Sequence, residues 1–414
     1  MIVKLPYGRE SLEVELPDET HVVEPMFVAA LADDADAIRG ALERPLGSKP
    51  LRALVSPGSR VGVAVCDVTR PFPAAKVLPV LLEQLEDSKV TLFVATGTHR
   101  SCTEQELDQI FGDEVRSQCR LVQHDAFDVG RHFTIGRLSA TGTPVLIERE
   151  FIAQDIRITT GFIEPHFFAG FSGGPKMVTP GLAGIETVLD LHSATRIGSR
   201  DARWGVTEGN PVHDAIREGA AMAGVNFNLD VTINRDHCIT GVFAGELFAS
   251  HAAGCRFVHE TAMARAPHRY DVVVTSNSGY PLDQNLYQSV KGMSAAAQIV
   301  RDGGTIVIAT ECSDGLPDHG HYKHLLKHAL GPDEFLRQLA EPDFSVHDQW
   351  QVQVQAQIQR RARVYVRADG LSDRQIRDAW FEPIRDISSL VQNLGGTVAV
   401  IPEGPQTIPY VATS

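Results

Sequence analysis

Apolar residues along this chain alternate between short continuous runs and segments with helical spacing. The runs at 60–66 and 89–95 are mostly apolar, whereas 74–85 between them repeats apolar residues every three or four positions. A short continuous run predicts a strand buried on both faces, and the helical repeat predicts an amphipathic helix. The alternation therefore predicts an α/β fold with mainly parallel sheets flanked by helices.

The same patterns extend along the whole chain. Thr103 with Glu106 three residues later has the pattern of a capping box, which marks the start of a helix. We expect a hairpin over 1–16, strands over 60–66, 89–95, 119–123, 155–160, 228–234, 271–275, 305–309, 364–367 and 397–401, and helices over 25–42, 74–85, 103–111, 185–196, 212–223, 247–264, 288–301, 332–339, 349–360 and 386–394.

The length and a second βαβ pattern predict two domains. A chain of 414 residues exceeds what one ordinary hydrophobic core accommodates. A short polar segment at 267–269 precedes a new strand, helix and strand, which has the pattern of a linker followed by a second α/β domain. We therefore expect domains over 1–266 and 267–414, each with a mainly parallel sheet flanked by helices, and an active site in the cleft between them.

Composition narrows the class of protein. Acidic residues outnumber basic ones by 52 to 38, and the formal charge of −14 argues against nucleic acid and anionic membranes as partners. The six cysteines form no CxxC pair, which is typical of buried thiols in a reducing compartment. The chain opens with no signal-peptide pattern and contains no 18-residue apolar run, so we expect a cytoplasmic location.

The segment 161–184 is a loop with chemical groups in it. It contains six glycines and three prolines, which suit neither a regular helix nor a central strand. His166 and Lys176 lie within it and His192 follows it, and each of these side chains is a candidate base, metal ligand or nucleophile. A long loop inside a compact domain is usually functional when it is too apolar to be disordered.

Within this loop, Ser172, Gly173 and Gly174 offer successive backbone N–H groups of the kind that hold a phosphate. We expect them to form an anion-binding turn. The alternative is an ordinary glycine-rich connection with solvated polar residues.

Polar side chains also follow two neighbouring strands of the first half. Asp67 and Arg70 follow the strand at 60–66, and His99 follows the strand at 89–95. Adjacent parallel strands deliver the residues after their carboxyl ends to one edge of a sheet, where open α/β sheets bind ligands. The guanidinium of Arg70 suits a carboxylate, although a structural pair of Arg70 with Asp67 is an equal alternative.

Two common catalytic motifs are absent from the sequence. No HExxH or GxGxxG motif occurs, which leaves zinc-hydrolase and nicotinamide-binding sites without support. In the second half, Gln288 and Lys291 fall one turn apart on one predicted helix face, and Trp350 is either a cleft wall or part of the core. The residues alone thus indicate an α/β enzyme with histidines, a lysine and an arginine around an anion-binding loop.

The ordered set of motifs resembles the nickel-dependent lactate racemase superfamily. The resemblance covers nearly the whole chain and includes His166, His192, Asp-Val-Thr-Arg-Pro at 67–71, Gly-Thr-His-Arg at 97–100, Gly-Phe-Ser-Gly-Gly-Pro-Lys at 170–176 and Tyr-Gln-Ser-Val-Lys-Gly at 287–292. It implies a nickel-pincer nucleotide, which is a pyridinium mononucleotide with two sulfur-bearing arms that hold Ni(II), covalently joined to Lys176, with His192 as a further nickel ligand.

The resemblance also implies a reaction. His99 and His166 would be the two catalytic bases, each taking the hydroxyl proton of one enantiomer while hydride passes to the cofactor and a 2-oxoacid forms. Arg70, Gln288 and Lys291 would hold the carboxylate and oxygen of the substrate. The remaining implied contacts are Asp67 and Tyr287 to the cofactor, the turn of Ser172, Gly173 and Gly174 to its phosphate tail, and Phe168 and Trp350 to the side chain of the substrate.

Several functional readings remain open at this point. The two aromatic side chains favour a small apolar substituent, as in lactate or 2-hydroxybutyrate, over racemisation of malate or C2 epimerisation of a sugar acid. A nickel-delivery protein and a nicotinamide-dependent dehydrogenase are the alternatives from other classes. The implied partners are a small 2-hydroxyacid and the proteins that build the cofactor, with domain 1–266 carrying the cofactor and the catalytic residues, and domain 267–414 closing over the substrate.

Overall fold

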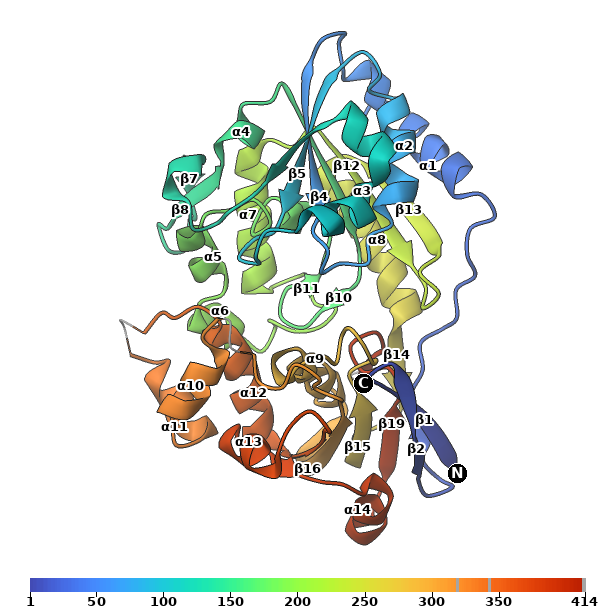
Figure 1. Cartoon of the computed structure of the whole chain (residues 1–414), viewed down its shortest axis with the longest axis vertical. Helices are drawn as coiled ribbons and strands as arrows, with labels where there is room; N and C mark the ends of the chain where they lie inside the picture. Colours follow the sequence, from blue (N-terminus) through green and yellow to red (C-terminus); the bar gives the residue numbers. More distant parts are fainter. Residues whose placement is uncertain (318–319, 342–343, 412–414) are drawn as a thin grey trace. The chain divides into compact units, whose positions relative to one another are not determined.

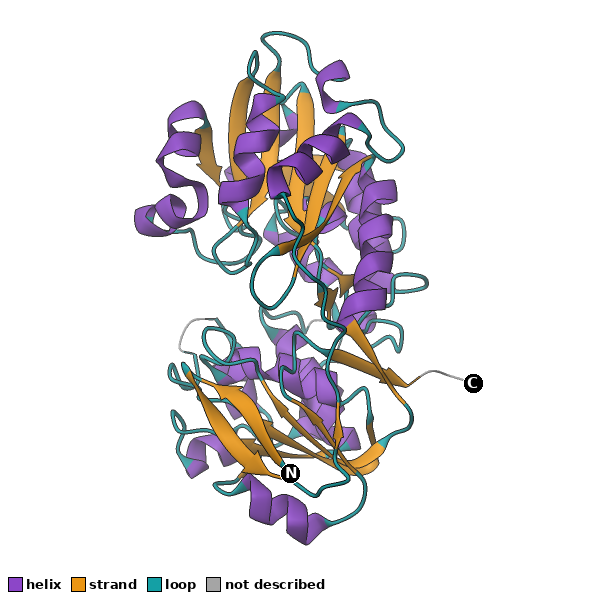
Figure 2. Cartoon of the chain, turned by 90° about the vertical axis from the view of Figure 1, so that its right-hand side faces the viewer, coloured by secondary structure: helices purple, strands orange, loops and turns teal. Residues whose placement is uncertain are grey.

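The computed structural model describes residues 1–317, 320–341 and 344–411. The chain forms two compact units, each built from a sheet and flanking helices (Figures 1 and 2). The first, here the N-terminal unit, comprises Phe27–His192 and Asp201–Glu260, and the second, the C-terminal unit, comprises Met1–Met26, Ser193–Arg200 and Thr261–Ser414. In the described part of the chain, no helix is long and apolar enough to cross a membrane.

The N-terminal unit is organised around a six-stranded sheet in the order β13-β12-β9-β4-β5-β6. All neighbours in it are parallel except β13, which is antiparallel to β12. The chain adds β5 and β6 on one side of β4 and later adds β9 and β12 on the other, so the strand order reverses at β4. The strands are β4 (Arg60–Cys66), β5 (Lys89–Ala95), β6 (Arg120–Gln123), β9 (Ile156–Phe162), β12 (Phe227–Ile233) and β13 (Ile239–Gly245).

Local signals in the sequence explain where several helices of this unit begin and end. The predicted capping box is present at the start of α3. The Thr103 hydroxyl oxygen accepts from the Glu106 amide, and the Glu106 carboxylate accepts from the Thr103 amide. α7 begins with an Asn210 cap and a first-turn proline, and ends at Gly224 in the left-handed conformation. The helices are α1 (Asp34–Glu43), α2 (Ala74–Glu83), α3 (Glu104–Gln118), α4 (Arg149–Ile152), α5 (Ile185–Leu191), α7 (Pro211–Ala223) and α8 (Leu247–Ala262).

The C-terminal unit has a six-stranded parallel sheet in the order β18-β17-β16-β15-β19-β3. Here too the order reverses at the first βαβ strand, because β16 and β17 lie on one side of β15 and β19 lies on the other. Its main elements are β3 (His21–Val22), β15 (Tyr270–Ser276), β16 (Val300–Ala309), β17 (Arg363–Arg367), β18 (Glu382–Pro383), β19 (Val398–Ile401), α6 (Ala194–Ile197), α9 (Leu286–Ala296), α10 (Tyr322–His328), α11 (Pro332–Gln338), α12 (Gln349–Arg361), α13 (Asp373–Asp378) and α14 (Ile387–Leu394).

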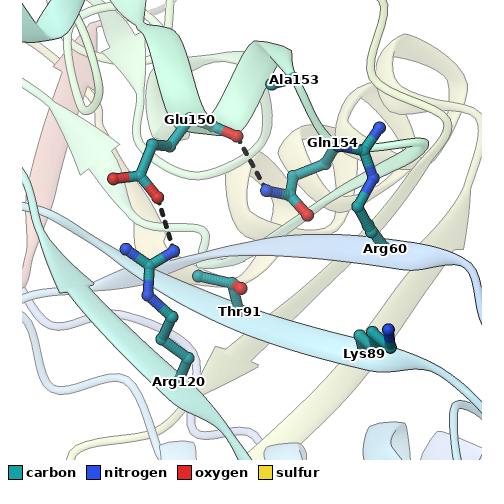
Figure 3. Close-up of a pocket in the computed structure, with 7 residues that line it drawn as sticks. All are labelled: Arg60, Lys89, Thr91, Arg120, Glu150, Ala153 and Gln154. Atoms are coloured by element: carbon teal, nitrogen blue, oxygen red, sulfur yellow. Dashed lines mark hydrogen bonds and ion pairs between the residues drawn. The ribbon is translucent and has the colours of Figure 1, made fainter.

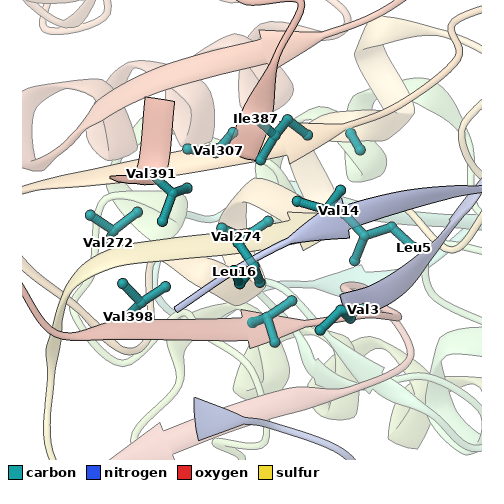
Figure 4. Close-up of a cluster of buried hydrophobic side chains, with 12 residues drawn as sticks. Val3, Leu5, Val14, Leu16, Val272, Val274, Val307, Ile387, Val391 and Val398 are labelled. Atoms are coloured by element: carbon teal, nitrogen blue, oxygen red, sulfur yellow. The ribbon is translucent and has the colours of Figure 1, made fainter. Parts of the chain in front are cut away.

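The amino-terminal hairpin packs on the sheet of the C-terminal unit. β1 (Ile2–Tyr7) pairs with β2 (Glu10–Glu15), and Leu5 and Val14 are fully or almost fully buried in a cluster with Val274 and Val307 (Figure 4). Burial of such side chains contributes about 1.5 to 3 kcal/mol each. The predicted single boundary after residue 266 therefore differs from the structure, which returns the first 26 residues to the C-terminal unit.

The α/β class with parallel-dominated sheets is confirmed, and several element boundaries are corrected. The helix expected over 25–42 begins only at Asp34, because Asp33 caps it and the preceding Met26 and Phe27 remain exposed. The helix expected over 185–196 ends before His192, and the helix expected over 288–301 stops at Ala296 because β16 follows. The elements that were not predicted include β13, α10, α13, and the hairpin of β7 (His132–Arg137) with β8 (Pro144–Glu148).

Candidate functional site

The carboxyl ends of β4 and β5 bring Asp67 and His99 together. Asp67 is buried, and its Oδ2 lies 2.7 Å from Nδ1 of the half-exposed His99. The other oxygen accepts from the Thr69 hydroxyl at 2.6 Å and from the Thr69 amide at 3.2 Å. Burial alone would raise the pKa of Asp67, but the hydrogen bonds from His99 and Thr69 and the charges of His99 and Arg70 together lower it.

This pairing sets the tautomer of His99. Because an ionised carboxylate accepts hydrogen bonds, Nδ1 of His99 carries a proton, and in the neutral ring the lone pair is therefore on Nε2. A neutral imidazole held in this way is suited to act as a general base. The expectation that β4 and β5 deliver Asp67, Arg70 and His99 to one edge of the sheet is confirmed, and Asp67 takes His99 as its side-chain partner.

Three further candidate residues lie in a row at the end of β9 and beyond it. The ring of Phe168 meets the ring of His166 edge to face at 4.5 Å between centroids, and meets the ring of His192 edge to face at 5.2 Å. Phe168 is buried, with an exposed fraction of 3%. His166, Phe168 and His192 therefore form one continuous aromatic surface within the N-terminal unit.

The two histidines of this row are held in opposite ways. Nδ1 of His192 lies 2.8 Å from the Val188 carbonyl oxygen, so Nδ1 donates, and in the neutral ring Nε2 carries the lone pair that a metal requires. In contrast, Nδ1 of His166 accepts the Ala169 amide at 3.2 Å, so the proton of the neutral ring is on Nε2. His166 thus presents a donor where His99 presents an acceptor.

The structure assigns a different role to the turn that was expected to hold phosphate. The Ser172 amide donates to the Glu164 carbonyl oxygen at 2.9 Å, and the Gly174 amide donates to the Asp230 carboxylate at 3.1 Å. Ser172, Gly173 and Gly174 are all buried. Two of the three N–H groups are therefore engaged inside the protein, and the expected phosphate cradle of successive free N–H groups is wrong.

Instead, this turn leads into the short 3₁₀ helix that carries Lys176. That helix, η3 (Gly174–Met177), begins at the last residue of the turn, and the Lys176 amide donates to the Gly173 carbonyl oxygen at 3.1 Å. The Lys176 carbonyl oxygen in turn accepts from the Gly181 amide at 3.0 Å. The backbone of Lys176 is thus fixed on both sides by the loop itself.

Sequence reasoning did not find the buried polar residues that hold this loop. Asn210 donates to the Phe168 carbonyl oxygen at 2.9 Å, His213 lies 3.2 Å from the Ala169 carbonyl oxygen, and His251 lies 2.9 Å from the Ser172 carbonyl oxygen. Burial lowers the pKa of His213 to about 4 and that of His251 to about 3, so both rings are neutral and donate. A signal for this layer was Asp230, a charged residue inside the apolar strand β12.

In the C-terminal unit, the predicted residues gather at the start of α9. Asn285 caps this helix by accepting from the Gln288 amide at 3.0 Å, and Lys291 follows one turn later. Trp350 donates from Nε1 to the Tyr287 hydroxyl at 3.3 Å, which brings these two side chains together. Trp350 is 6% exposed, and Trp350 and Tyr287 lie in the first turns of α12 and α9. That this set and the histidines of the N-terminal unit form one site in a cleft remains a prediction.

A cavity of about 300 Å³ in the N-terminal unit lies at the opposite edge of the sheet (Figure 3). It is lined by Arg60, Lys89 and Arg120 at the starts of β4, β5 and β6. Arg120 pairs with Glu150 at 2.5 Å, and Arg60 pairs with Asp155 at 2.6 Å. Its cations are therefore largely used in surface ion pairs, and the cavity is separate from the residues at the carboxyl ends of the strands.

In the described residues, no three His, Cys, Asp or Glu side chains gather as a metal site. A metal held by His192 would thus take its other ligands from a bound group. His192 fits such a group as one ligand, since the bond of its Nδ1 to the Val188 carbonyl makes Nε2 the nitrogen that would coordinate the metal.

The fold and these residues define a two-domain α/β enzyme with histidines and a lysine at the carboxyl edge of its first sheet. Residues 7–205 match the family model described as the lactate racemase N-terminal domain, and residues 266–408 match the lactate racemase C-terminal domain. The chain belongs to the lactate racemase family, and it is an isomerase.

Relatives of known name and structure are similar over nearly the whole chain. A lactate racemase of Thermoanaerobacterium thermosaccharolyticum is 35% identical, with 98% of each chain covered, and one of Lactiplantibacillus plantarum is 33% identical, with 97% of this chain and 98% of the relative covered. The structure of the Thermoanaerobacterium lactate racemase apoprotein superposes with a TM-score of 0.93 at 34% identity, over 99% of this chain and 100% of that one. A protein of Thermotoga maritima shares the fold at 17% identity, with a TM-score of 0.71 over 93% of this chain and 100% of that one.

Proposed function

We propose that this protein racemises short-chain 2-hydroxyacids of the lactate type with a nickel-pincer nucleotide joined to Lys176. The observation that carries the proposal is the row of His166, Phe168 and His192, in which two imidazoles flank one buried aromatic ring and the Val188 carbonyl fixes the orientation of the His192 ring. Its supporting observation is the Asp67–His99 pair at the carboxyl edge of the same sheet. Family membership makes a racemase reaction the natural use of two histidines.

The residues of this chain would hold the cofactor at three points. Lys176 would carry it through a thioamide, His192 would coordinate nickel through Nε2, and Tyr287 would contact the nucleotide. The cofactor, when bound, supplies an acceptor that takes hydride from the substrate carbon and returns it to either face. Asp67, although it was expected to contact the cofactor, is better placed to orient His99, because its two oxygens are occupied by His99 and Thr69.

Proton movement would be the task of the two histidines. His99 takes the hydroxyl proton of one enantiomer on Nε2, because its Nδ1 proton is already held by Asp67. His166, when both of its ring nitrogens are protonated, would return the Nε2 proton to the oxygen of the 2-oxoacid, and the neutral ring that remains would take a proton in the opposite direction. Both of these forms carry a proton on Nδ1, which requires loss of the bond from the Ala169 amide.

Substrate binding would involve both units. Arg70 would pair with the carboxylate, and Gln288 and Lys291 would hold the remaining oxygens. Phe168 would face the substituent on the reacting carbon together with Trp350, and the polar group of Trp350 is already paired with Tyr287. Two apolar walls favour the methyl of lactate or the ethyl of 2-hydroxybutyrate over the carboxylate of malate or the hydroxyls of a sugar acid.

The test is intact mass and nickel content of protein produced together with the cofactor-making enzymes, followed by assays without added NAD. Single enantiomers of lactate, 2-hydroxybutyrate, malate and gluconate are the substrates. We expect a mass increment and nickel near one per chain in the wild type, loss of both in Lys176→Ala, and retention of both in the control Lys89→Ala, whose exposed lysine lies at the opposite sheet edge.

Each alternative reading predicts a different result. Turnover of gluconate but not lactate would indicate an epimerase of sugar acids. A nickel-delivery protein would retain its activity in His99→Ala and His166→Ala. An unmodified, nickel-free, folded protein that turns over hydroxyacid only with NAD would indicate a dehydrogenase and refute the proposal.

A further inference from the structure

The loop that carries Lys176 rests on buried polar side chains from three different elements. His213 of α7 and His251 of α8 donate to the carbonyl oxygens of Ala169 and Ser172. Asp230 of β12 is the one of the three that accepts, since its Oδ1 takes the Gly174 amide at 3.1 Å. Gly174 is the first residue of the 3₁₀ helix that contains Lys176.

The glycines of the loop fit closely around this carboxylate. A β-carbon added to Gly161 would lie 2.5 Å from Oδ1 of Asp230, and one added to Gly173 would lie 3.2 Å from the same atom. A β-carbon on Gly174 would lie 2.6 Å from the His251 ring, and Gly174 also has a positive φ of 48°. Glycine is therefore needed at these positions because the backbone must approach Asp230 and His251.

Burial of Asp230 at this position lowers the stability of the fold. It is fully buried, and its interactions within the described part of the chain are the bonds from Gly174 and from Asn228 Nδ2 at 2.9 Å, with no cation among them. A buried carboxylate without a cation costs folding free energy. A charged acceptor forms a stronger hydrogen bond with an amide than a neutral acceptor does. The stronger bond to Gly174 offsets part of the free energy lost by burying the carboxylate.

We propose that Asp230 is a positioning residue for Lys176. Its carboxylate fixes the Gly174 amide, which sets the start of η3 and hence the direction in which Lys176 leaves the backbone. This inference rests on the proposed attachment of a cofactor to Lys176. Asp230 itself touches neither Lys176 nor a substrate in this role, so it acts through Gly174.

The first measurement uses the protein without cofactor and follows hydrogen exchange of the Gly174 amide. Asp230→Leu replaces the carboxylate by an apolar group with the same branching and removes the acceptor, and Asp230→Asn keeps an uncharged acceptor. We expect exchange at Gly174 to be roughly tenfold faster or more in the leucine variant and several-fold faster in the asparagine variant, with amides of β9 unchanged. Thr232→Val is the matched control, because Thr232 lies on the same strand and its hydroxyl pairs with that of Thr240 at 2.8 Å rather than with the loop.

The second measurement is the fraction of chains that carry the mass increment after production with the cofactor-making enzymes. We expect Asp230→Leu to lose most of it, and Asp230→Asn and Thr232→Val to retain it. Unchanged Gly174 exchange in the asparagine variant would overturn the inference even if the leucine variant does not fold. Full loading of a folded leucine variant would overturn it as well. A wild type that never acquires the increment would instead refute the proposed function, and the exchange result would then stand alone.

Discussion

Replacement of Asp230 by asparagine should change how the stability of the N-terminal unit depends on pH. Burial raises the pKa of Asp230 from an ordinary value of 3.8 to about 6, against the opposing hydrogen bonds from Asn228 and Gly174. Each tenfold change in proton affinity corresponds to about 1.4 kcal/mol. Ionisation of this one carboxyl therefore costs the folded state about 3 kcal/mol, and because Asp230 is fully buried no discount for solvent screening applies.

The sign follows from the order of the two pKa values. The unfolded chain releases the Asp230 proton near pH 4, whereas the folded protein retains it until about pH 6. Stability is thus lost as the pH rises between these values, and the loss persists at neutral pH. About 2 kcal/mol of it should accrue between about pH 4.5 and 7.5. Asparagine has no proton to release, so the variant should lack this loss.

The assay compares differences, which cancels the other titrating groups. Urea unfolding is followed by the fluorescence of Trp204, which is buried in the same unit next to Phe167, in a background where Trp350 and Trp380 are phenylalanine. The free energy of unfolding of the asparagine variant minus that of the parent should rise by about 2 kcal/mol from pH 4.5 to 7.5. The same difference for Thr232→Val should stay constant.

A difference for Asp230→Asn that stays within about 0.5 kcal/mol over this pH range would refute the reasoning. Such a result would mean that Asp230 titrates near its ordinary pKa in the folded protein. It would also mean that the ionised carboxylate does not lower the stability of the folded protein.

Three other predictions test separate parts of the molecule. Asp67→Asn should lower kcat/KM by roughly 100- to 10,000-fold from either enantiomer, because His99 loses the partner that fixes its tautomer; a loss of less than roughly tenfold in a progress-curve assay would contradict this role. Phe168→Ala should raise kcat/KM for longer 2-hydroxyacids relative to lactate by roughly tenfold or more, and an unchanged ratio would exclude Phe168 as a wall of the substrate site. Leu5→Ala should destabilise the C-terminal unit by about 2 to 5 kcal/mol in urea unfolding followed by Trp380, with Trp204 reporting an unchanged N-terminal unit.

Strand ends were the most predictable part of the site. A run of apolar residues followed by Asp67 or His99 is a local signal that can be recognised in the sequence. Parallel pairing of β4 with β5 then brings the residues after both strands to the same edge of the sheet. The predicted neighbourhood of Asp67 and His99 is accordingly confirmed at 2.7 Å. Whether a histidine nitrogen donates or accepts depends on which partner the fold places next to it, and the sequence does not show that partner. The opposite tautomers of His99 and His166 could therefore not be predicted.

Long-range packing explains the main errors in the fold. The pattern of the hairpin at 1–16 says that one face is apolar, but it does not say which sheet covers that face, and the structure pairs it with strands more than 250 residues away. Likewise, glycine and serine N–H groups at 172–174 could satisfy either a phosphate or the protein itself. In the structure, the Gly174 amide donates to Asp230, which lies on a strand far along the chain and could not be paired with Gly174 from the sequence.

The Asp230→Asn variant separates two effects of Asp230, which are the loss of stability caused by its charge and its contribution to cofactor loading. If asparagine raises stability at neutral pH and still loads the cofactor, then the acceptor matters and the charge is tolerated. If it raises stability but loses loading, then the charge itself is needed to hold Gly174, and stability is given up for the position of Lys176. A buried charge with a displaced pKa next to a functional loop is the pattern expected when function and stability compete. Measuring stability and loading on the same variant distinguishes a structural carboxylate from one retained for the position of the lysine.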